Sequence, residues 1–259
     1  MQNLTISLVQ ADQKWEDKTA NFLNYERLLD ANELGDVVLL PEMFHTGFSM
    51  NTELLGETME ESQGLQWLKE NAKRRNIAIY TSLIIKDGEH YFNRGVFVEP
   101  DGKTTTYDKR KTFGLAGEDN FYSSGKEKSV VNFKGWNIFL QICYDLRFPE
   151  ICRNQLDENG VANYDLLLYV ANWPETRSLH WNTLLQARAI ENQCYVAGVN
   201  RVGSAPNNLS YSGNSQVVDL LGNVQAMEPH KEGLVSFELN GSILTETRQK
   251  LPFLKDAQF

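Results

Sequence analysis

Short apolar segments alternate with amphipathic ones along the first third of the chain. Residues 4–10 and 36–42 are short and rich in branched apolar side chains, as buried strands are, whereas residues 21–34 between them repeat apolar positions at helical spacing. The same order returns with a helix predicted over residues 65–76 and a strand over residues 77–85. Because strands that alternate with helices build a sheet covered by helices, this pattern predicts an α/β fold.

The pattern changes to hairpins between residues 91 and 143. Asp101 and Gly102 separate two extended runs, and Lys134 and Gly135 separate two more. A residue pair that ends in glycine favours the tight turn of a β-hairpin, since glycine accepts a positive φ. The predicted domain is therefore a mixed α/β one.

Strands and helices alternate again beyond residue 143. Strands are predicted over residues 164–174, 194–202, 215–222 and 234–240, with a helix over residues 178–193. No Ser- or Gly-rich linker, charge block or short repeat divides the chain, so we expect a single domain over residues 1–259. Apolar and aromatic side chains continue into a tail over about residues 241–259, which we expect to pack on this domain or on a second copy of the chain.

The charge of the chain narrows the range of partners. Its 259 residues include 34 acidic and 25 basic side chains, and the formal net charge of −9 argues against nucleic acid and against an anionic membrane surface. Small molecules or other proteins are the expected partners. The first residues lack the pattern of a signal peptide, and no apolar stretch is long enough to span a bilayer, which predicts a cytoplasmic protein.

Cysteine and histidine usage argues against disulfides and metal sites. The three cysteines are Cys143, Cys152 and Cys194, an odd number without a C-x-x-C pair. The four histidines lie far apart in the sequence and show no metal-binding spacing. We therefore expect reduced thiols, no metal ion and no other cofactor.

Three residues with catalytic chemistry follow predicted strands, where α/β sheets gather their ligand sites. They are Glu42, Lys109 and Cys143. Singly, Glu42 could cap a loop, Lys109 could be a solvated surface charge and Cys143 could fill the core. Together they would supply a base, a cation and a nucleophile for attack on a carbonyl or nitrile carbon, since the thiolate is the attacking species and needs both neighbours. His45 is a rival base on spacing alone.

Five sequence blocks in order resemble the nitrilase, or carbon–nitrogen hydrolase, superfamily. The blocks are LLPEMFHTGF, YDKRKTF, GEDNFYSSG, CYDLRFPE and LLLYVANWPETRSLHWNTLLQARAIENQCYVAGVNRVG. The resemblance implies a four-layer α-β-β-α sandwich of the nitrilase type. It also implies that Glu42 is the general base, Cys143 the nucleophile and Lys109, two positions after Tyr107, the lysine of the triad. Glu118 matches a second acidic residue that positions the substrate and the lysine.

Within this superfamily the chain is most similar to bacterial omega-amidases. That similarity implies hydrolysis of the terminal amide of 2-oxoglutaramate or 2-oxosuccinamate to a 2-oxo acid and ammonia through a cysteine thioester, in a homodimer. The same triad would also serve an N-carbamoyl amidohydrolase or a nitrilase, and a non-catalytic small-molecule-binding relative is the alternative from another class. Lys111, Thr112 and Asp119 depart from the usual family pattern.

Further residues are candidates for holding the substrate. The backbone N–H of Tyr144 is expected to bind the oxyanion, because it lies where a strand ends and a helix can begin. A 2-oxo acid amide carries a carboxylate, for which Arg177 is the candidate partner because guanidinium binds carboxylate in a bidentate manner. Trp173 and Phe113 are candidates for the pocket walls, with Trp181 as a further aromatic that could equally belong to the core. The competing cations are Arg147, Arg188 and Arg201.

Overall fold

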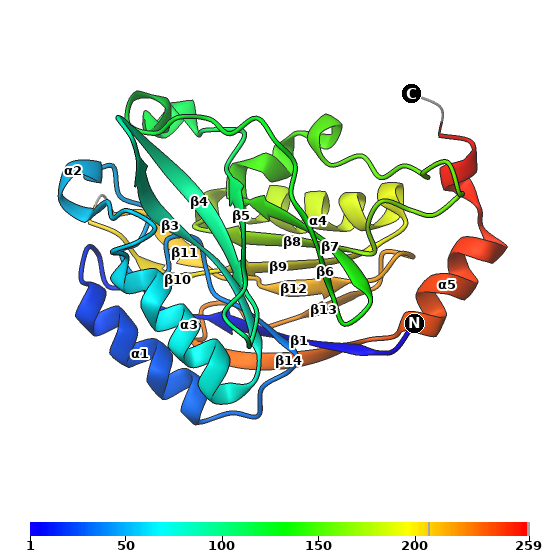
Figure 1. Ribbon diagram of the computed structural model, residues 1–259, viewed down its shortest axis with the longest axis horizontal. Coiled ribbons are helices and arrows are strands. Elements are labelled where there is room, and N and C mark those ends of the chain that lie inside the picture. The colour runs from blue at the N-terminus through cyan, green and yellow to red at the C-terminus, as the bar shows by residue number, and fades with distance from the viewer. Residues whose placement is uncertain (207, 258–259) are drawn as a thin grey trace.

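Two six-stranded β-sheets form the centre of the protein (Figure 1). The computed structural model describes residues 1–206 and 208–257, and within this part of the chain it places both sheets and one small two-stranded sheet. The first large sheet has the order β14 (Gly233–Leu239), β1 (Leu4–Gln10), β2 (Val37–Leu39), β3 (Ala78–Asp87), β4 (His90–Val98) and β5 (Thr104–Asp108). The second has the order β13 (Val224–Ala226), β12 (Gln216–Val218), β9 (Tyr195–Asn200), β8 (Leu166–Ala171), β7 (Trp136–Ile142) and β6 (Val130–Phe133). The small sheet pairs β10 (Val202–Ser204) with β11 (Ser210–Ser212).

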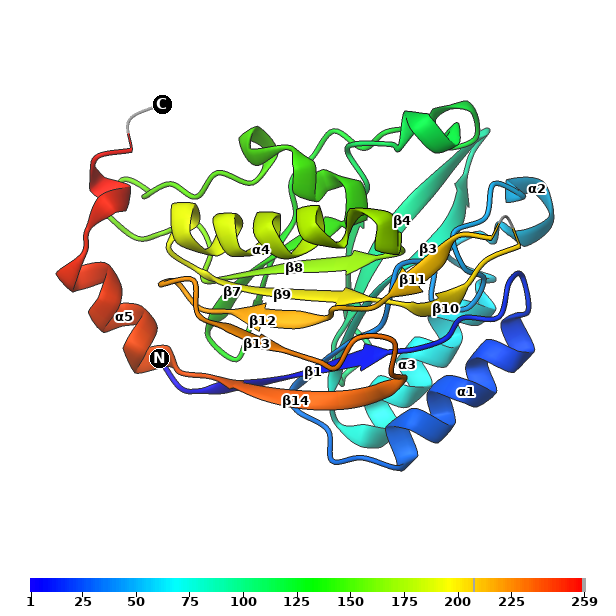
Figure 2. The same cartoon turned by 180° about the vertical axis from the view of Figure 1, so that it is seen from behind.

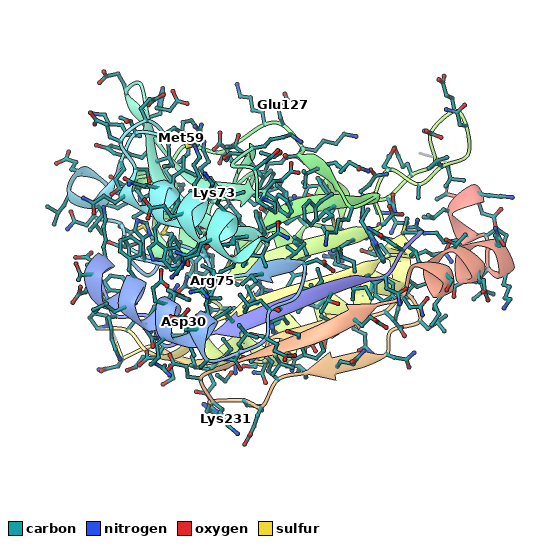
Figure 3. The ribbon with its side chains drawn as sticks, turned by 60° about the horizontal axis from the view of Figure 1, so that its bottom comes forward. Asp30, Met59, Lys73, Arg75, Glu127 and Lys231 are labelled. Carbon is teal, nitrogen blue, oxygen red and sulfur yellow. The ribbon has the colours of Figure 1, made fainter. Side chains whose placement is uncertain are left out.

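Helices cover the outer face of each large sheet (Figures 1 and 2). Helices α1 (Lys18–Asp30) and α3 (Gln63–Arg75) share an apolar cluster with the first sheet, and α4 (Ser178–Asn192) packs on the second sheet against β9. Arg75 of α3 forms an ion pair with Asp30 of α1 at 2.6 Å, which joins the two helices at their outer surface (Figure 3). The predicted four-layer α-β-β-α sandwich is confirmed.

The main core lies between the two sheets. Ile6 and Leu8 of β1 belong to this inner cluster, whereas Val9 belongs to the cluster under α1 and α3. Successive side chains of a strand point to opposite faces, so a strand covered on both sides must be apolar at nearly every position. That requirement explains why the strands appear as continuous apolar runs in the sequence.

Both predicted hairpins form. β4 pairs with β5 around Gly102, and β6 pairs with β7 around a turn in which Lys134 and Gly135 both have positive φ, 50° and 79°. Because β3 also pairs antiparallel with β4, the strands from β3 to β5 form a meander at one edge of the first sheet. This arrangement brings the end of β5, where Lys109 follows, toward the loop after β2.

Several short elements were not predicted. They are α2 (Thr52–Leu55), β10, β11, β13 and six short 3₁₀ turns: η1 (Gly114–Ala116), η2 (Glu118–Asn120), η3 (Cys143–Arg147), η4 (Pro149–Ile151), η5 (Glu175–Arg177) and η6 (Phe253–Lys255). Helix α1 begins earlier than predicted because Asp17 caps it, accepting a hydrogen bond from the Ala20 N–H at 2.9 Å. None of the helices in residues 1–206 and 208–257 is long and apolar enough to cross a bilayer.

The tail contains a further helix, α5 (Gly241–Lys250), which is capped by Asn240. Leu244 and Leu254 are buried against the same chain, and Arg248 forms an ion pair with Asp165 at 2.7 Å. The described part of the tail therefore docks on its own domain, while Phe253 remains exposed. Residues 258 and 259 lie outside the described residues.

Candidate active site

The three strand-end candidates converge on one cavity. Glu42 follows β2, Lys109 follows β5 and Cys143 follows β7, so that two come from the first sheet and one from the second. Lys109 and Cys143 line a cavity of about 370 Å³, and Glu42 lies buried close to both. The three strand ends therefore meet at one place, as expected for an α/β sheet.

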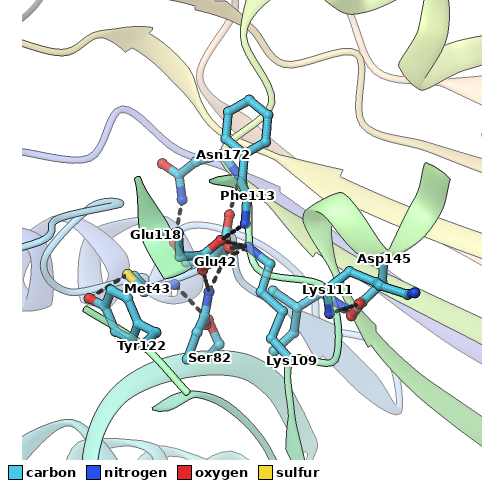
Figure 4. A network of polar contacts seen from close by, with 12 residues as sticks. Glu42, Met43, Ser82, Lys109, Lys111, Phe113, Glu118, Tyr122, Asp145 and Asn172 are labelled. Carbon is cyan, nitrogen blue, oxygen red and sulfur yellow. Dashed lines mark hydrogen bonds and ion pairs between the residues drawn. The ribbon is translucent and has the colours of Figure 1, made fainter. Parts of the chain in front are cut away.

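Lys109 lies between two carboxylates (Figure 4). Its Nζ is 3.0 Å from Glu42 Oε1 and 2.9 Å from Glu118 Oε2, and the three side chains are at most 1% exposed. Burial alone would disfavour the ammonium, but the Glu118 and Glu42 carboxylates outweigh it and raise the pKa of Lys109 above its usual value. The alternative of a solvated surface lysine is thereby excluded, and the site holds a fixed positive charge.

Two asparagines that sequence reasoning missed fix the Glu42 carboxylate. The Asn172 backbone N–H donates to Glu42 Oε2 at 2.9 Å (Figure 4). Asn93 Nδ2 donates to Glu42 Oε1 at 2.8 Å and to Glu118 Oε1 at 3.2 Å. Asn172 follows β8, so the strand-end rule could have found it. Asn93 lies inside β4 and carried no such signal.

Cys143 adopts a strained backbone conformation. Its φ is 45°, in the left-handed region that few non-glycine residues adopt, and it stands where β7 ends and η3 begins. Burial raises the pKa of the Cys143 thiol well above its usual value, and the Glu42 carboxylate adds to the rise, while the Lys109 ammonium opposes it. The sulfur is therefore a protonated thiol at rest and needs a base before it can attack.

Two guanidinium groups and several aromatic rings also line the cavity. The Arg177 guanidinium lies 5.5 Å from the Phe113 ring centre, and that of Arg147 lies 4.7 Å from the Trp173 ring centre. These four side chains and Tyr144 all line the cavity. The structure thus places the predicted Arg177, Trp173 and Phe113 together, with Arg147 as a second cation.

The other two arginines and Trp181 are structural. Arg188 donates to the Leu146 carbonyl at 2.6 Å, and Arg201 donates to the Gln13 carbonyl at 2.9 Å. Trp181 is fully buried in the main core. None of these three side chains lines the cavity.

His45 also lies outside the cavity. It is buried against Phe44, with ring centres 5.0 Å apart, and its Nε2 is 3.8 Å from a Glu57 oxygen. Burial lowers the pKa of His45, although Glu57 opposes that shift. The geometry does not favour His45 as the base for Cys143.

The remaining polar candidates have simple placements. Cys152 and Cys194 are buried free thiols away from the cavity. Lys111 Nζ lies 3.6 Å from Glu150 Oε1. Neither Lys111 nor Asp119 lines the cavity, so these two departures from the family pattern lie outside its wall. Within residues 1–206 and 208–257, no group of three or more histidine, cysteine, aspartate or glutamate side chains is arranged to hold a metal ion.

Comparison with known proteins decides the family. The family model described as carbon-nitrogen hydrolase matches residues 5–249. The chain belongs to the carbon-nitrogen hydrolase family. This carbon-nitrogen hydrolase is 44% identical over 257 residues to an omega-amidase, YafV, of Yersinia enterocolitica, with 99% of this chain and 97% of the relative covered. It is 32% identical over 257 residues to a 2-oxoglutaramate amidase of Bacillus subtilis, with 97% and 96% covered.

A crystal structure supports the same placement of this carbon-nitrogen hydrolase. A CN-hydrolase superfamily protein from Xanthomonas campestris, with an arsenic adduct in its active site, matches with a TM-score of 0.95 at 41% identity, covering 100% of this chain and 98% of that one. Nit3 of Saccharomyces cerevisiae, a member of branch 10 of the nitrilase superfamily, matches with a TM-score of 0.84 at 25% identity, covering 100% and 97%. The nitrilase-type fold is therefore shared with solved members of the superfamily.

Proposed function

We propose that this carbon-nitrogen hydrolase is an omega-amidase that hydrolyses the terminal amide of 2-oxo acid amides such as 2-oxoglutaramate and 2-oxosuccinamate. The observation that carries the proposal is the cavity itself, which has Cys143 beside a buried Glu42, Lys109 and Glu118 cluster and two guanidinium groups in its wall. Full-length relatives named omega-amidase and 2-oxoglutaramate amidase support the same substrate class.

In the first step Glu42 takes the proton from the Cys143 thiol. The sulfur then attacks the amide carbon, and the carbonyl oxygen becomes an oxyanion. Since burial raises the pKa of the thiol, the proton transfer is coupled to the attack and does not precede it as a resting thiolate. The hydrogen bonds from Asn172 and Asn93 hold the Glu42 carboxylate in one orientation for this transfer.

Lys109 and the Tyr144 backbone N–H stabilise the oxyanion. The Lys109 ammonium is fixed by Glu118, and the Tyr144 N–H is among the first of η3, whose leading N–H groups have no partner within the turn. Loss of one such donor typically reduces the rate by ~10²–10³.

Glu42 then completes both halves of the reaction. It gives its proton to the amide nitrogen, the C–N bond breaks and ammonia leaves a Cys143 thioester. It next takes a proton from water, whose oxygen attacks the thioester and releases the 2-oxo acid, and the sulfur regains a proton. One carboxylate thus acts as base, acid and base again.

The substrate carboxylate binds at the outer end of the cavity. Arg177 provides the bidentate partner, and Arg147 adds a second positive charge on the same wall. Trp173 and Phe113 flank these guanidinium groups and line the passage for the short carbon chain between carboxylate and amide.

Ammonia release from 2-oxoglutaramate by the purified protein tests the function. The parent and Cys152→Ala, a matched cysteine outside the cavity, should release ammonia and 2-oxo acid in equal amounts, and Cys143→Ala should release none. Turnover by Cys143→Ala would overturn the nucleophile. A parent that is silent on 2-oxo acid amides but releases carbon dioxide and ammonia from N-carbamoyl compounds, or acid from nitriles, would replace the omega-amidase proposal.

We further infer a cytoplasmic homodimer. The exposed Ile243 and Phe253 of the docked tail offer apolar surface to a second copy. Light scattering coupled to gel filtration should give twice the chain mass, and a monomer at micromolar concentration would contradict the inference.

A further inference from the structure

Asp145, two residues after the cysteine, is a buried carboxylate outside the triad. It has no exposed surface. Its Oδ2 accepts hydrogen bonds from the Tyr107 hydroxyl at 2.8 Å and the Ile142 N–H at 3.1 Å, and its Oδ1 accepts from the Lys111 N–H at 2.9 Å. All three donors are neutral, so each bond compensates only part of the cost of burying the charge.

The donors come from two segments that must meet in the active site. Ile142 immediately precedes Cys143, whereas Tyr107 and Lys111 stand two residues before and two residues after Lys109. One carboxylate therefore links the turn after β7, in the second sheet, to the end of β5, in the first. The Lys109 backbone is held on both sides by this link.

The strain at Cys143 makes such a link necessary. A non-glycine residue with a φ of 45° keeps that conformation only when its surroundings enforce it. The bond to the Ile142 N–H constrains the residue before the cysteine, and Asp145 itself lies in η3, which carries the Tyr144 N–H.

We propose that Asp145 is a positioning residue, which sets the Cys143 sulfur and the Tyr144 N–H relative to the Lys109 ammonium so that both oxyanion donors point at one place. The inference rests on the proposed function for its chemistry but not for its geometry. A misplacement of about 1 Å in such a site is enough to reduce a rate by about 10²-fold.

A purely structural role fits less well. Burial raises the pKa of Asp145 to about 6, above its ordinary value of 3.8, even though Lys109 and the three hydrogen bonds oppose the shift. The ionised side chain is thus a cost to folding at neutral pH. A residue retained for stability alone would not have this property.

Asp145→Asn tests the proposal. The asparagine has one carbonyl, which can keep either the Ile142 and Tyr107 bonds or the Lys111 bond, and its NH₂ group then faces a donor at the other position. We expect kcat on 2-oxoglutaramate to fall about 10- to 100-fold with KM within about threefold, while the melting temperature does not fall. Alkylation of Cys143 by iodoacetamide, followed by mass spectrometry, should slow by a factor of about ten or more.

Tyr107→Phe is the matched variant, because it keeps the carboxylate and removes one donor. It should slow alkylation by about threefold to tenfold with a melting temperature within a few degrees of the parent, and it keeps the proposal testable if Asp145→Asn does not fold. Parental kcat and alkylation rate in either folded variant would overturn the positioning role. The alkylation readout needs no substrate, so a parent that is inactive on 2-oxoglutaramate would refute the proposed function alone.

Discussion

Lys109 and Glu118 form an ion pair at 2.9 Å in which the lysine side chain is 1% exposed and the glutamate side chain is not exposed at all. Glu42 shares the same ammonium at 3.0 Å. Two buried carboxylates therefore share one cation, and the ion pair with Glu118 weakens the one between Lys109 and Glu42. Glu118 therefore helps to fix the Lys109 ammonium beside the Cys143 sulfur.

Glu118→Gln should therefore reduce kcat by about 10²-fold with little change in KM. The amide keeps the shape of the side chain, but Lys109 loses an anionic partner, so its ammonium is no longer fixed where it stabilises the oxyanion. Steady-state ammonia release measures this effect. Asp119→Asn changes the adjacent carboxylate, which lies outside the cavity, and should keep parental kinetics; an equal loss in both variants would contradict the argument.

Arg177→Gln should raise KM for 2-oxoglutaramate by about 10- to 100-fold, because a charge-assisted bond to a carboxylate is worth about 1.5–3 kcal/mol. For a neutral amide of equal length, KM should not change. Arg147→Gln should raise KM less, and the two substitutions together should be non-additive because the guanidinium groups share the cavity. Arg110→Gln, whose guanidinium binds the Ile151 carbonyl outside the cavity, serves as the control.

The strand ends were predictable, since apolar runs show where strands stop and the strand ends of an α/β sheet gather its ligand sites. Glu42, Lys109 and Cys143 were all singled out in this way, and the structure brings them together; the same rule would also have singled out Asn172. The Lys134 and Gly135 turn was equally local, because a glycine between two extended runs favours the positive φ of a tight turn. Elements with such local signals were predicted well.

Contacts between distant segments were not predictable from local pattern. Asn93 is one of several polar residues in β4, beside Arg94, and it bonds to Glu42, 51 residues away, only because the meander folds back. Asp145 joins positions on two sheets, and no spacing in the sequence indicates that pairing. Helix α5 was missed because its stability depends on docking to the rest of the domain more than on its own pattern.

Arg248→Met should destabilise the protein through α5. The Arg248 guanidinium donates to Asp165 at 2.7 Å and to the Gln193 and Tyr164 carbonyls at 2.8 Å each, so its removal leaves a largely buried carboxylate short of its cation. We expect a loss of about 2–3 kcal/mol in the free energy of unfolding, or about 5–10 °C in melting temperature. The kcat at low temperature should not change.

Lys250→Met is the control for that substitution, on the same helix. Its ion pair with Glu246 is exposed on both sides, at 74% and 60%, so it should alter the free energy of unfolding by less than about 0.5 kcal/mol. Equal melting temperatures for Arg248→Met and Lys250→Met would show that the Arg248 contacts do not hold α5.

Asp145 should make the parent less stable as pH rises from about 4 to about 6. Burial raises the pKa of this carboxyl from 3.8 to about 6 in the folded protein, so the unfolded chain ionises first and the folded protein binds more protons across this window. Below pH 4 both states are protonated and the group contributes nothing. Above pH 6 the cost is complete, at about 3 kcal/mol from ~1.4 kcal/mol for each pKa unit.

Urea unfolding of the parent and Asp145→Asn across pH 4 to 7 measures this cost. The other carboxyls titrate in both proteins, so subtracting the parent's free energy of unfolding from that of Asp145→Asn isolates the effect of Asp145. This difference should increase by about 3 kcal/mol as pH rises, because only the parent loses stability through Asp145. The titratable groups that interact with this carboxyl include Lys109, Tyr107, Tyr80 and Cys152. Each keeps one protonation state in this range, with Lys109 charged and the others neutral. A difference that does not vary with pH would contradict the prediction. A variant that is more stable and less active at pH 7 would show a charge kept for catalysis at the expense of stability.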